Sequence, residues 1–184
     1  MKFEIRPILE GDGKGINLLR RMPGTFESIL GIPSERIKRN EDFIVTMGPE
    51  NHAFVAVTAD ERNEELIIGM ANLYVNTNHR LRHSAGVGIM IHTDYQDKGV
   101  GTALMNTLID IADNWLMLVR IELTVFADNS RAIHMYEKLG FVKEGVKKYA
   151  AIKSGKYEDE LMMARINHSK LPIGDVTVVE TQTR

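Results

Sequence analysis

One short segment of the sequence has residue types that suit the binding of an anionic group. Between an apolar, strand-like stretch and the start of a helical pattern lies Gln96-Asp97-Lys98-Gly99-Val100-Gly101-Thr102. The first turn of a helix presents backbone N–H groups without intrahelical partners and the positive end of the helix dipole. Glycine lacks the Cβ atom that would keep a bulky anion away. The segment therefore predicts a phosphate-binding turn, although an isolated Gly-x-Gly is more often only a flexible turn.

Two better-known phosphate motifs do not fit this segment. A P-loop carries Lys-Ser or Lys-Thr after its second glycine, whereas Gly101 is followed by Thr102-Ala103. A dinucleotide fingerprint needs a third glycine and opens the first strand–helix unit of its domain. Here the segment follows four strand-like stretches. The sequence therefore disfavours a nucleoside triphosphatase and a dinucleotide-binding enzyme.

A second segment, from Asn129 to Phe141, carries a tyrosine on a short helical pattern. Asp128 or Asn129 can cap this helix, and Gly140 suits its C-terminal end. Tyr136 lies in the middle of the pattern, and its residue type alone fits a core residue packed on a sheet.

The rest of the chain predicts the elements that position these two segments. Period-2 patterns indicate strands, and apolar residues at a spacing of three or four indicate helices. The strands expected from these patterns are 2–8, 52–58, 65–74, 84–92, 120–126, 141–149 and 157–166, and the expected helices are 16–22, 33–47, 99–115 and 129–139. Glycines at 86 and 88 inside one strand suggest a bulge or a close backbone approach.

Composition narrows the class of protein. The 184 residues are 43% hydrophobic and 26% charged, with a net charge of −2, six histidines and no cysteine. Such a chain favours a single domain, which we place at 1–167, followed by a tail at 168–184 that contains the strand-like stretch 176–179. The balanced charge disfavours nucleic-acid and membrane partners, and the absence of cysteine excludes thiolate chemistry and fits a cytoplasmic location. No histidine spacing indicates a metal site.

The two segments, in this order, resemble the signature motifs of the GCN5-related N-acetyltransferase (GNAT) superfamily. Its phosphate loop reads Gln/Arg-x-x-Gly-x-Gly/Ala, which Gln96, Gly99 and Gly101 match. Its later helix reads Asn-x-x-Ala-x-x-x-Tyr-x-x-x-Gly-Phe, which Asn129 to Phe141 matches. The resemblance implies a mixed α/β N-acyltransferase fold. It would have a central, mostly antiparallel seven-stranded sheet with splayed central strands and about four helices.

The resemblance also implies a cofactor, acetyl-CoA, and the residues that would hold it. Backbone groups of Ile89, Met90 and Ile91 would pair with its pantetheine arm, and amides from Gln96 to Thr102 would hold its pyrophosphate. Asn129 and Ala132 would contact the cofactor at the start of the later helix. Tyr136 would protonate the departing thiolate.

The resemblance leaves the proton acceptor for the incoming amine open. Many relatives place a carboxylate on the fourth strand, where this chain has Gly86. Deprotonating a lysine side chain at neutral pH costs about 4 to 5 kcal/mol, but an α-amine only about 1 kcal/mol, so a missing carboxylate favours an α-amine acceptor. His83 and Glu122 are candidate bases, and an ordered water held by backbone groups is an alternative.

Taken together, the resemblance implies an N-acetyltransferase of the bacterial branch that acts on amino acids and similar small amines. The acceptor pocket would lie near the segment 22–33 and near Tyr149 and Tyr157, which flank the last turn. Two alternatives stay open, namely an enzyme that acetylates protein N-termini or a ribosomal protein, and a non-catalytic coenzyme A sensor or interaction module. A homodimer is expected because relatives often pair.

Overall fold

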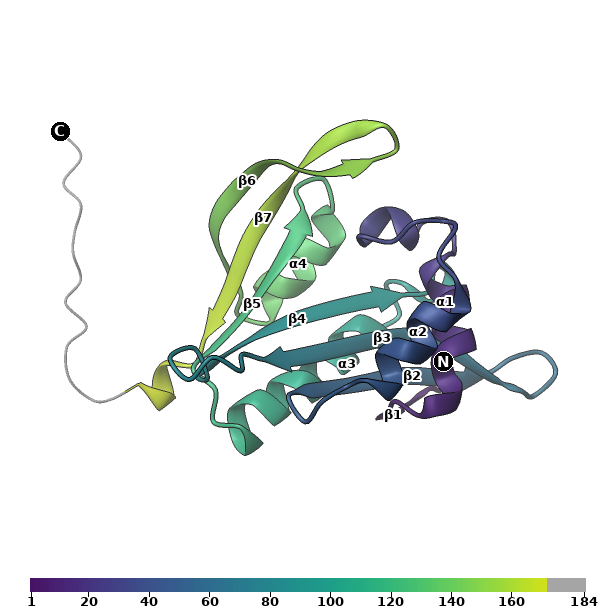
Figure 1. The fold of residues 1–184 in the computed structure, drawn as a ribbon, viewed down its shortest axis with the longest axis horizontal. Coiled ribbons are helices and arrows are strands. Elements are labelled where there is room, and N and C mark those ends of the chain that lie inside the picture. The colour runs from purple at the N-terminus through teal and green to yellow at the C-terminus, as the bar shows by residue number, and fades with distance from the viewer. Residues whose placement is uncertain (172–184) are drawn as a thin grey trace.

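The computed structural model describes residues 1–171 and contains one seven-stranded sheet in the order β1-β2-β3-β4-β5-β7-β6 (Figure 1). All neighbouring strands are antiparallel except β4 and β5, which are parallel. This confirms the mostly antiparallel sheet expected from the sequence. The strands are β1 (Glu4–Pro7), β2 (Asn51–Ala59), β3 (Glu65–Val75), β4 (Ser84–Ile91), β5 (Arg120–Phe126), β6 (Val142–Lys153) and β7 (Lys156–Ile166).

Four α-helices cover the two faces of this sheet: α1 (Gly13–Arg20), α2 (Ile37–Val45), α3 (Val100–Asp110) and α4 (Ser130–Lys138). Figure 1 shows α1 and α2 in front of β2 and β3, with α3 behind them. We call these two sides the α1–α2 face and the α3–α4 face. Each face buries one of the two sets of alternating side chains that a strand presents.

The central strands diverge after a short contact. β4 and β5 pair only through Ser84–Arg120, Ala85–Ile121 and Gly86–Glu122, and then separate. In Figure 1 the two strands meet at one end and open toward the other. Beyond Gly86, the side of β4 that faces β5 therefore has no strand partner, as the resemblance implied.

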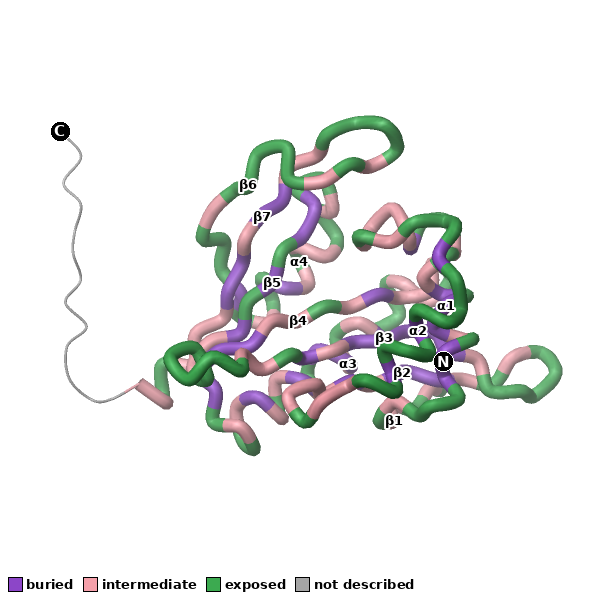
Figure 2. The backbone as a smooth tube through the Cα atoms, viewed as in Figure 1, coloured by how far each residue is buried: buried purple, intermediate pink, exposed green. Residues whose placement is uncertain are grey.

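Two apolar clusters fill the two faces. On the α3–α4 face, a large cluster joins α3 to β3, β4, β5 and β7 through residues such as Leu104, Leu108, Leu73 and Leu123. On the α1–α2 face, a smaller cluster centres on Ile16, Leu19, Met70 and Met90. Burial accordingly follows the inner strands and fades along the protruding β6–β7 hairpin (Figure 2).

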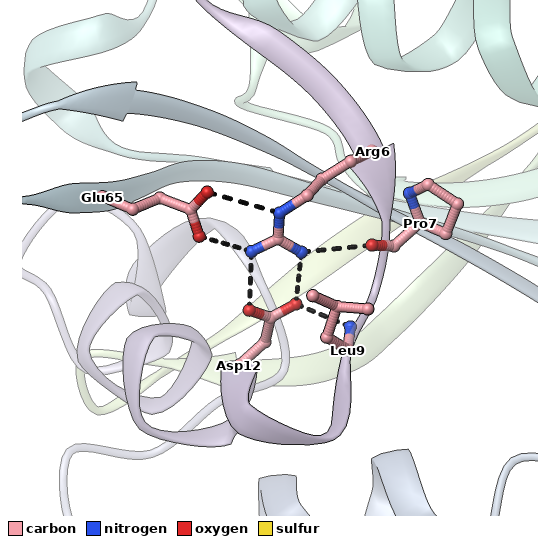
Figure 3. Close-up of polar contacts among 5 residues, drawn as sticks. All are labelled: Arg6, Pro7, Leu9, Asp12 and Glu65. Atoms are coloured by element: carbon pink, nitrogen blue, oxygen red, sulfur yellow. Dashed lines mark hydrogen bonds and ion pairs between the residues drawn. The ribbon is translucent and has the colours of Figure 1, made fainter.

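An ion-pair cluster fixes the start of α1 against the sheet (Figure 3). Both terminal nitrogens of Arg6 on β1 bond the Asp12 carboxylate at 2.8 Å, and the same guanidinium reaches Glu65 at the start of β3. The backbone N–H of Leu9 also donates to Asp12 at 2.8 Å. Burial alone would raise the pKa of Asp12, but these hydrogen bonds outweigh it and the net pKa lies below the ordinary value.

The expected element boundaries differ in several places. The first helix, expected at 16–22, spans Gly13–Arg20. α2 begins at Ile37 rather than at 33, because the chain first turns to bury the Glu35 side chain against Arg20. The long helix ends at Asp110 and continues as a π-helical turn, Ile111–Trp115. The last hairpin is longer than expected and turns at Ser154 and Gly155 instead of ending at 149.

The strand-like stretch 176–179 lies outside the described residues. Within residues 1–171, no helix is long and apolar enough to cross a membrane.

Candidate active site

A cavity of about 910 Å³ passes through the opening between β4 and β5. Side chains from both faces of the sheet line it. Ile89 and Ile91 belong to the α3–α4 face, whereas Met90 belongs to the α1–α2 face. On β5, Val125 and Phe126 line the cavity from opposite faces in the same way. A ligand in this cavity can therefore approach from two sides and meet a partner in the middle.

The loop before α3 forms one mouth of this cavity. Gly99 (φ +85°) and Asp97 (φ +57°) have left-handed backbone conformations, which turn the chain sharply into the helix. Among residues 1–171, the backbone N–H groups of residues 97–102 donate to no protein acceptor, whereas that of Ala103 donates to the Gly99 carbonyl at 3.0 Å. This row of free donors at a helix N-terminus fits a pyrophosphate group.

The approach of the Met135 side chain leaves little room for a side chain at position 101. A Cβ atom there would lie 3.0 Å from the Met135 sulfur of α4, which is too close for ordinary packing. α4 also contributes Arg131 and Lys138 to the cavity wall, so cations accompany the free amides. The geometry thus matches the size and charge of a phosphorylated ligand.

Tyr136 of α4 forms part of the cavity wall and is only 6% exposed. Its ring packs against Phe141 at a centroid distance of 5.7 Å. Burial raises the pKa of Tyr136 to about 12, so the phenol keeps its proton through the neutral range. A protonated hydroxyl group in the wall of the opening is placed to act as an acid.

Three polar side chains make hydrogen bonds to residues of the cavity wall. The Gln96 amide donates to the Ile91 carbonyl at 3.2 Å, which joins the phosphate loop to β4. Asn129 caps α4, because its Oδ1 accepts from the Ala132 N–H at 3.2 Å, and both residues line the cavity. On the opposite side, the hydroxyl group of buried Thr25 donates to the same Ile91 carbonyl.

Charged side chains form the wall on the α1–α2 face. Arg20 and Arg39 line the cavity there, and both donate to the carboxylate of Glu35, whose side chain is 1% exposed. Burial alone would raise the pKa of Glu35, but the hydrogen bond from Arg20 and the neighbouring charges lower the net pKa below the ordinary value. One carboxylate between two guanidinium groups leaves this end of the cavity with excess positive charge.

Two further polar groups reach the cavity without a partner among residues 1–171. The side-chain oxygen of Asn72, on β3, is fully buried and accepts no hydrogen bond. Glu160, on β7, is 8% exposed, and no side-chain hydrogen bond or ion pair reaches its carboxylate within the described residues. Strand register places Asn72 opposite Gly88 and Glu160 opposite Phe126, both on the α1–α2 face.

Of the cofactor-binding residues suggested by the sequence, all but Lys98 and Val100 line the cavity. The structure places there Ile89, Met90, Ile91, Gln96, Asp97, Gly99, Gly101, Thr102, Asn129, Ala132 and Tyr136. The Lys98 ammonium lies over the Tyr95 ring at 5.3 Å, and the Val100 side chain is buried in the core. Lys98 and Val100 therefore contribute only their backbone N–H groups to the phosphate loop.

The two candidate bases, His83 and Glu122, do not line the cavity. His83 is exposed where β4 and β5 meet, and its carbonyl accepts from the Val119 and Arg120 N–H groups. Glu122 is 48% exposed in its side chain and pairs with Arg120 at 2.8 Å. Tyr149 and Tyr157, the suggested acceptor residues, stack edge-on in solvent on the last hairpin and do not line the cavity.

The sequence reading missed most residues of the α1–α2 face of the cavity. Asn72 could have been identified from the sequence, because it is a polar residue inside an otherwise apolar strand. Arg20 and Arg39 lie in amphipathic helices, where arginine is ordinary. Glu160 follows Glu158 and Asp159, so that the run looks like a solvated face. Only the strand register shows that its side chain turns inward.

Comparison with known proteins points to one family. A model of the Acetyltransferase (GNAT) family matches residues 21–141. The L-amino acid N-acetyltransferase AaaT of Escherichia coli (strain K12) is 42% identical over 100 residues, covering 54% of this chain and 62% of that protein. The spermidine N(1)-acetyltransferase of Vibrio cholerae serotype O1 is 35% identical over 100 residues, covering 54% of this chain and 56% of that protein. The matched region thus spans less than two thirds of either relative.

Similarity in three dimensions covers more of the chain. The crystal structure of spermidine N-acetyltransferase from Vibrio cholerae in complex with CoA and spermine superposes with a TM-score of 0.76. The alignment covers 92% of this chain and 98% of that chain at 27% identity. The overall fold is therefore shared with a protein whose structure contains CoA and spermine.

Proposed function

The chain belongs to the GNAT acetyltransferase family, and from this premise we propose that it transfers an acetyl group from acetyl-CoA to the primary amine of a small molecule. The observation that carries the proposal is the cavity through the splayed sheet. It has free backbone donors at one mouth, a protonated tyrosine in its wall and polar side chains at the other mouth. Two substrates can meet there and react directly.

Different residues of the chain bind the cofactor and donate the proton in this reaction. Bound acetyl-CoA supplies a thioester with an activated carbonyl carbon and a thiolate leaving group. The amides of residues 97–102 hold its pyrophosphate, and the unpaired side of β4 beyond Gly86 orients its arm. Tyr136 gives its proton to the departing sulfur, which is a modest demand because an ordinary thiol has a pKa of about 8.5.

The acceptor we propose is the α-amine of an amino acid. Arg20 and Arg39 line the acceptor mouth, and Arg39 keeps 64% of its side chain exposed while making one hydrogen bond, at 3.2 Å, to Glu35. A guanidinium group with free N–H donors suits a carboxylate and repels a polyamine. The similarity to the Escherichia coli L-amino acid N-acetyltransferase supports this choice over the spermidine enzymes.

A panel of amines tests this proposal. Free coenzyme A release from acetyl-CoA is measured with the twenty amino acids, their methyl esters, spermidine, N-terminal peptides and N-acetylated amino acids as blocked controls. We expect amino acids to react faster than their methyl esters, which lack the carboxylate. Turnover of peptides alone would indicate that the acceptor is a protein N-terminus. Coenzyme A binding without any turnover would favour a non-catalytic coenzyme A sensor.

One pair of variants links the panel to the structure. Arg39→Gln removes the exposed guanidinium group, and we expect KM for amino acids to rise about tenfold with KM for methyl esters unchanged. Lys38→Gln removes the neighbouring charge on α2, whose ammonium pairs with Asp42 outside the cavity. Equal effects of the two variants on both substrate types would contradict carboxylate recognition by Arg39.

We further propose a homodimer that works in the cytoplasm. The β6–β7 hairpin exposes Tyr149, Ile152 and Tyr157, which supply an apolar surface for a second copy. The lack of cysteine agrees with a reducing compartment. Light scattering after gel filtration measures the oligomeric state directly.

A further inference from the structure

Glu160 differs from the other buried carboxylates of the described residues. Asp12 accepts hydrogen bonds from Arg6 and Leu9, and Glu35 accepts from Arg20, Arg39 and Asn40. Glu160 is buried to a similar degree, yet no side-chain hydrogen bond or ion pair reaches its carboxylate anywhere in residues 1–171. Buried carboxylates are normally paired. The Glu160 oxygens are instead open to the cavity, because among residues 1–171 only the Asn72 side-chain oxygen is both fully buried and unpartnered. The structure of the protein alone leaves this donor missing.

The position of Glu160 indicates where the missing donor comes from. Its side chain lines the cavity on the α1–α2 face, opposite Phe126 of β5, which lines the cavity as well. The phosphate loop lies before α3, which covers the other face of the sheet. Glu160 therefore belongs to the mouth through which a second substrate enters. The buried, unpartnered oxygen of Asn72 lies on the same face.

The unpaired carboxylate of Glu160 is the group at this mouth that can receive a cation. The other charged or titratable groups that line the cavity are Arg20 and Arg39 from the α1–α2 face, Asp97 of the phosphate loop, and Arg131, His134 and Lys138 of α4, together with Tyr136. Asp97 is 72% exposed and lies 3.6 Å from Arg131. Lys147, opposite Glu160 on β6, forms no ion pair with it within 4.0 Å. Glu160 is thus the carboxylate of the acceptor mouth that is free to receive an ammonium group.

We infer that Glu160 is the proton acceptor for the incoming amine. The inference rests on the proposed acetyl transfer and replaces the two bases that the structure places elsewhere. The Glu160 carboxylate accepts an N–H hydrogen bond from the acceptor's ammonium group and takes one proton. The freed nitrogen lone pair forms the N–C bond to the acetyl carbon while the C–S bond breaks. Tyr136 protonates the sulfur, the second N–H proton restores the phenol, and the proton on Glu160 passes to solvent.

The variant Glu160→Gln keeps the shape and removes the base. With the amino acid that turns over fastest in the panel, we expect kcat/KM at pH 7 to fall about 10²- to 10³-fold, the range for loss of a general base. The deficit relative to the unmodified protein should shrink as pH rises from 7 to 9.5, because a growing fraction of the α-amine is then neutral and needs no base. A purely structural role would give a loss that does not depend on pH.

Binding measurements supply a readout that is independent of turnover. Calorimetry without acetyl-CoA should show at least tenfold weaker binding of the same amino acid to Glu160→Gln, with coenzyme A affinity and Tm unchanged. Glu158→Gln is the matched control, because Glu158 is an acid on the same strand and face but does not line the cavity. His134→Gln removes the imidazole that also lines the cavity, so its pH profile separates that group from Glu160.

Two results would overturn the inference. Turnover of Glu160→Gln within threefold of the unmodified protein removes Glu160 from the chemistry, and so does a loss that is equal at all pH values. An unmodified protein that binds coenzyme A but acetylates no amine in the panel would instead refute the proposed function, and this inference with it. The two failures are thus distinguished by the activity of the unmodified protein.

Discussion

The two faces of the sheet are built from different interactions. The α3–α4 face is held by a large apolar cluster, and its cavity wall relies on backbone amides and glycine. The α1–α2 face has a smaller apolar cluster and depends on buried ion pairs around Asp12 and Glu35. Backbone groups can recognise a chemical group that all ligands of one class share, such as the pyrophosphate of coenzyme A derivatives. Charged side chains can be exchanged one at a time, so this second face is where acceptor preference can change without loss of the fold.

The largest effect that separates the two faces is expected from Tyr136→Phe. It removes the acid from the α3–α4 face, and kcat should fall about 10²-fold or more. Coenzyme A affinity should stay unchanged, because the phosphate loop does not depend on the phenol. Stopped-flow or steady-state thiol assays together with calorimetry check both statements. Unchanged turnover would mean that chemistry is confined to the α1–α2 face.

Glu35→Gln should act on stability and leave coenzyme A binding intact. Removing a buried acceptor of two guanidinium groups should lower the free energy of unfolding by about 2 to 3 kcal/mol at pH 7. Because the pKa of Glu35 is lowered in the folded protein, its contribution is present above about pH 4.5 and is lost as pH falls through the folded pKa. Urea unfolding at several pH values should therefore show a weaker acid dependence in the variant.

The matched control is Glu61→Gln in the exposed β2–β3 turn, where we expect little change. A variant of Glu35 that loses coenzyme A affinity as strongly as stability would contradict the separation of the two faces.

Gly101→Val should weaken coenzyme A binding about tenfold, or about 1.4 kcal/mol. A Cβ atom at this position already meets the Met135 sulfur at 3.0 Å, and larger groups extend into the cavity mouth. Calorimetric titration with coenzyme A measures the change. Gly11→Ala, where a Cβ atom meets nothing within 4 Å, is the control. Normal affinity in Gly101→Val would place the pyrophosphate elsewhere.

The smallest effect is expected from Glu122→Gln. This exposed carboxylate shares Arg120 with Glu144, so the change in unfolding free energy should be below about 0.5 kcal/mol. Turnover should stay within twofold, since Glu122 does not line the cavity. A tenfold loss of turnover would instead show that the acceptor site extends to the end of β4 and β5 where the two strands pair.

The same contrast explains how much could be predicted from the sequence. The site residues on the α3–α4 face can be predicted from local patterns. Gly99 and Gly101 indicate the turn that leaves the amides of residues 97–102 free, and the apolar spacing around Tyr136 indicates a helix. The sheet, its strand number and its splay also agree with expectation. Local sequence suffices where backbone conformation makes the site.

The α1–α2 face could not be predicted in this way, because its groups converge from distant parts of the chain. Arg20 and Glu35 are fifteen residues apart, and Glu160 joins the same cavity from the last strand. The acidic run that contains Glu160 looks solvated until register with Phe126 fixes its direction. His83 and Glu122 are candidates by residue type alone, and neither lines the cavity, because both lie where β4 and β5 meet.

The short contact of β4 with β5 has a consequence for how the fold responds to ligands. Three residue pairs join the backbone ladders of the two halves of the sheet, so the amides of β4 beyond Gly86 that face β5 lack interstrand protection. In deuterated solvent these amides should exchange by local opening, well below the free energy of global unfolding. A ligand that bonds this edge occupies the place of an absent strand. Substrate then becomes a transient part of the secondary structure, and saturation with it should slow the exchange of these amides.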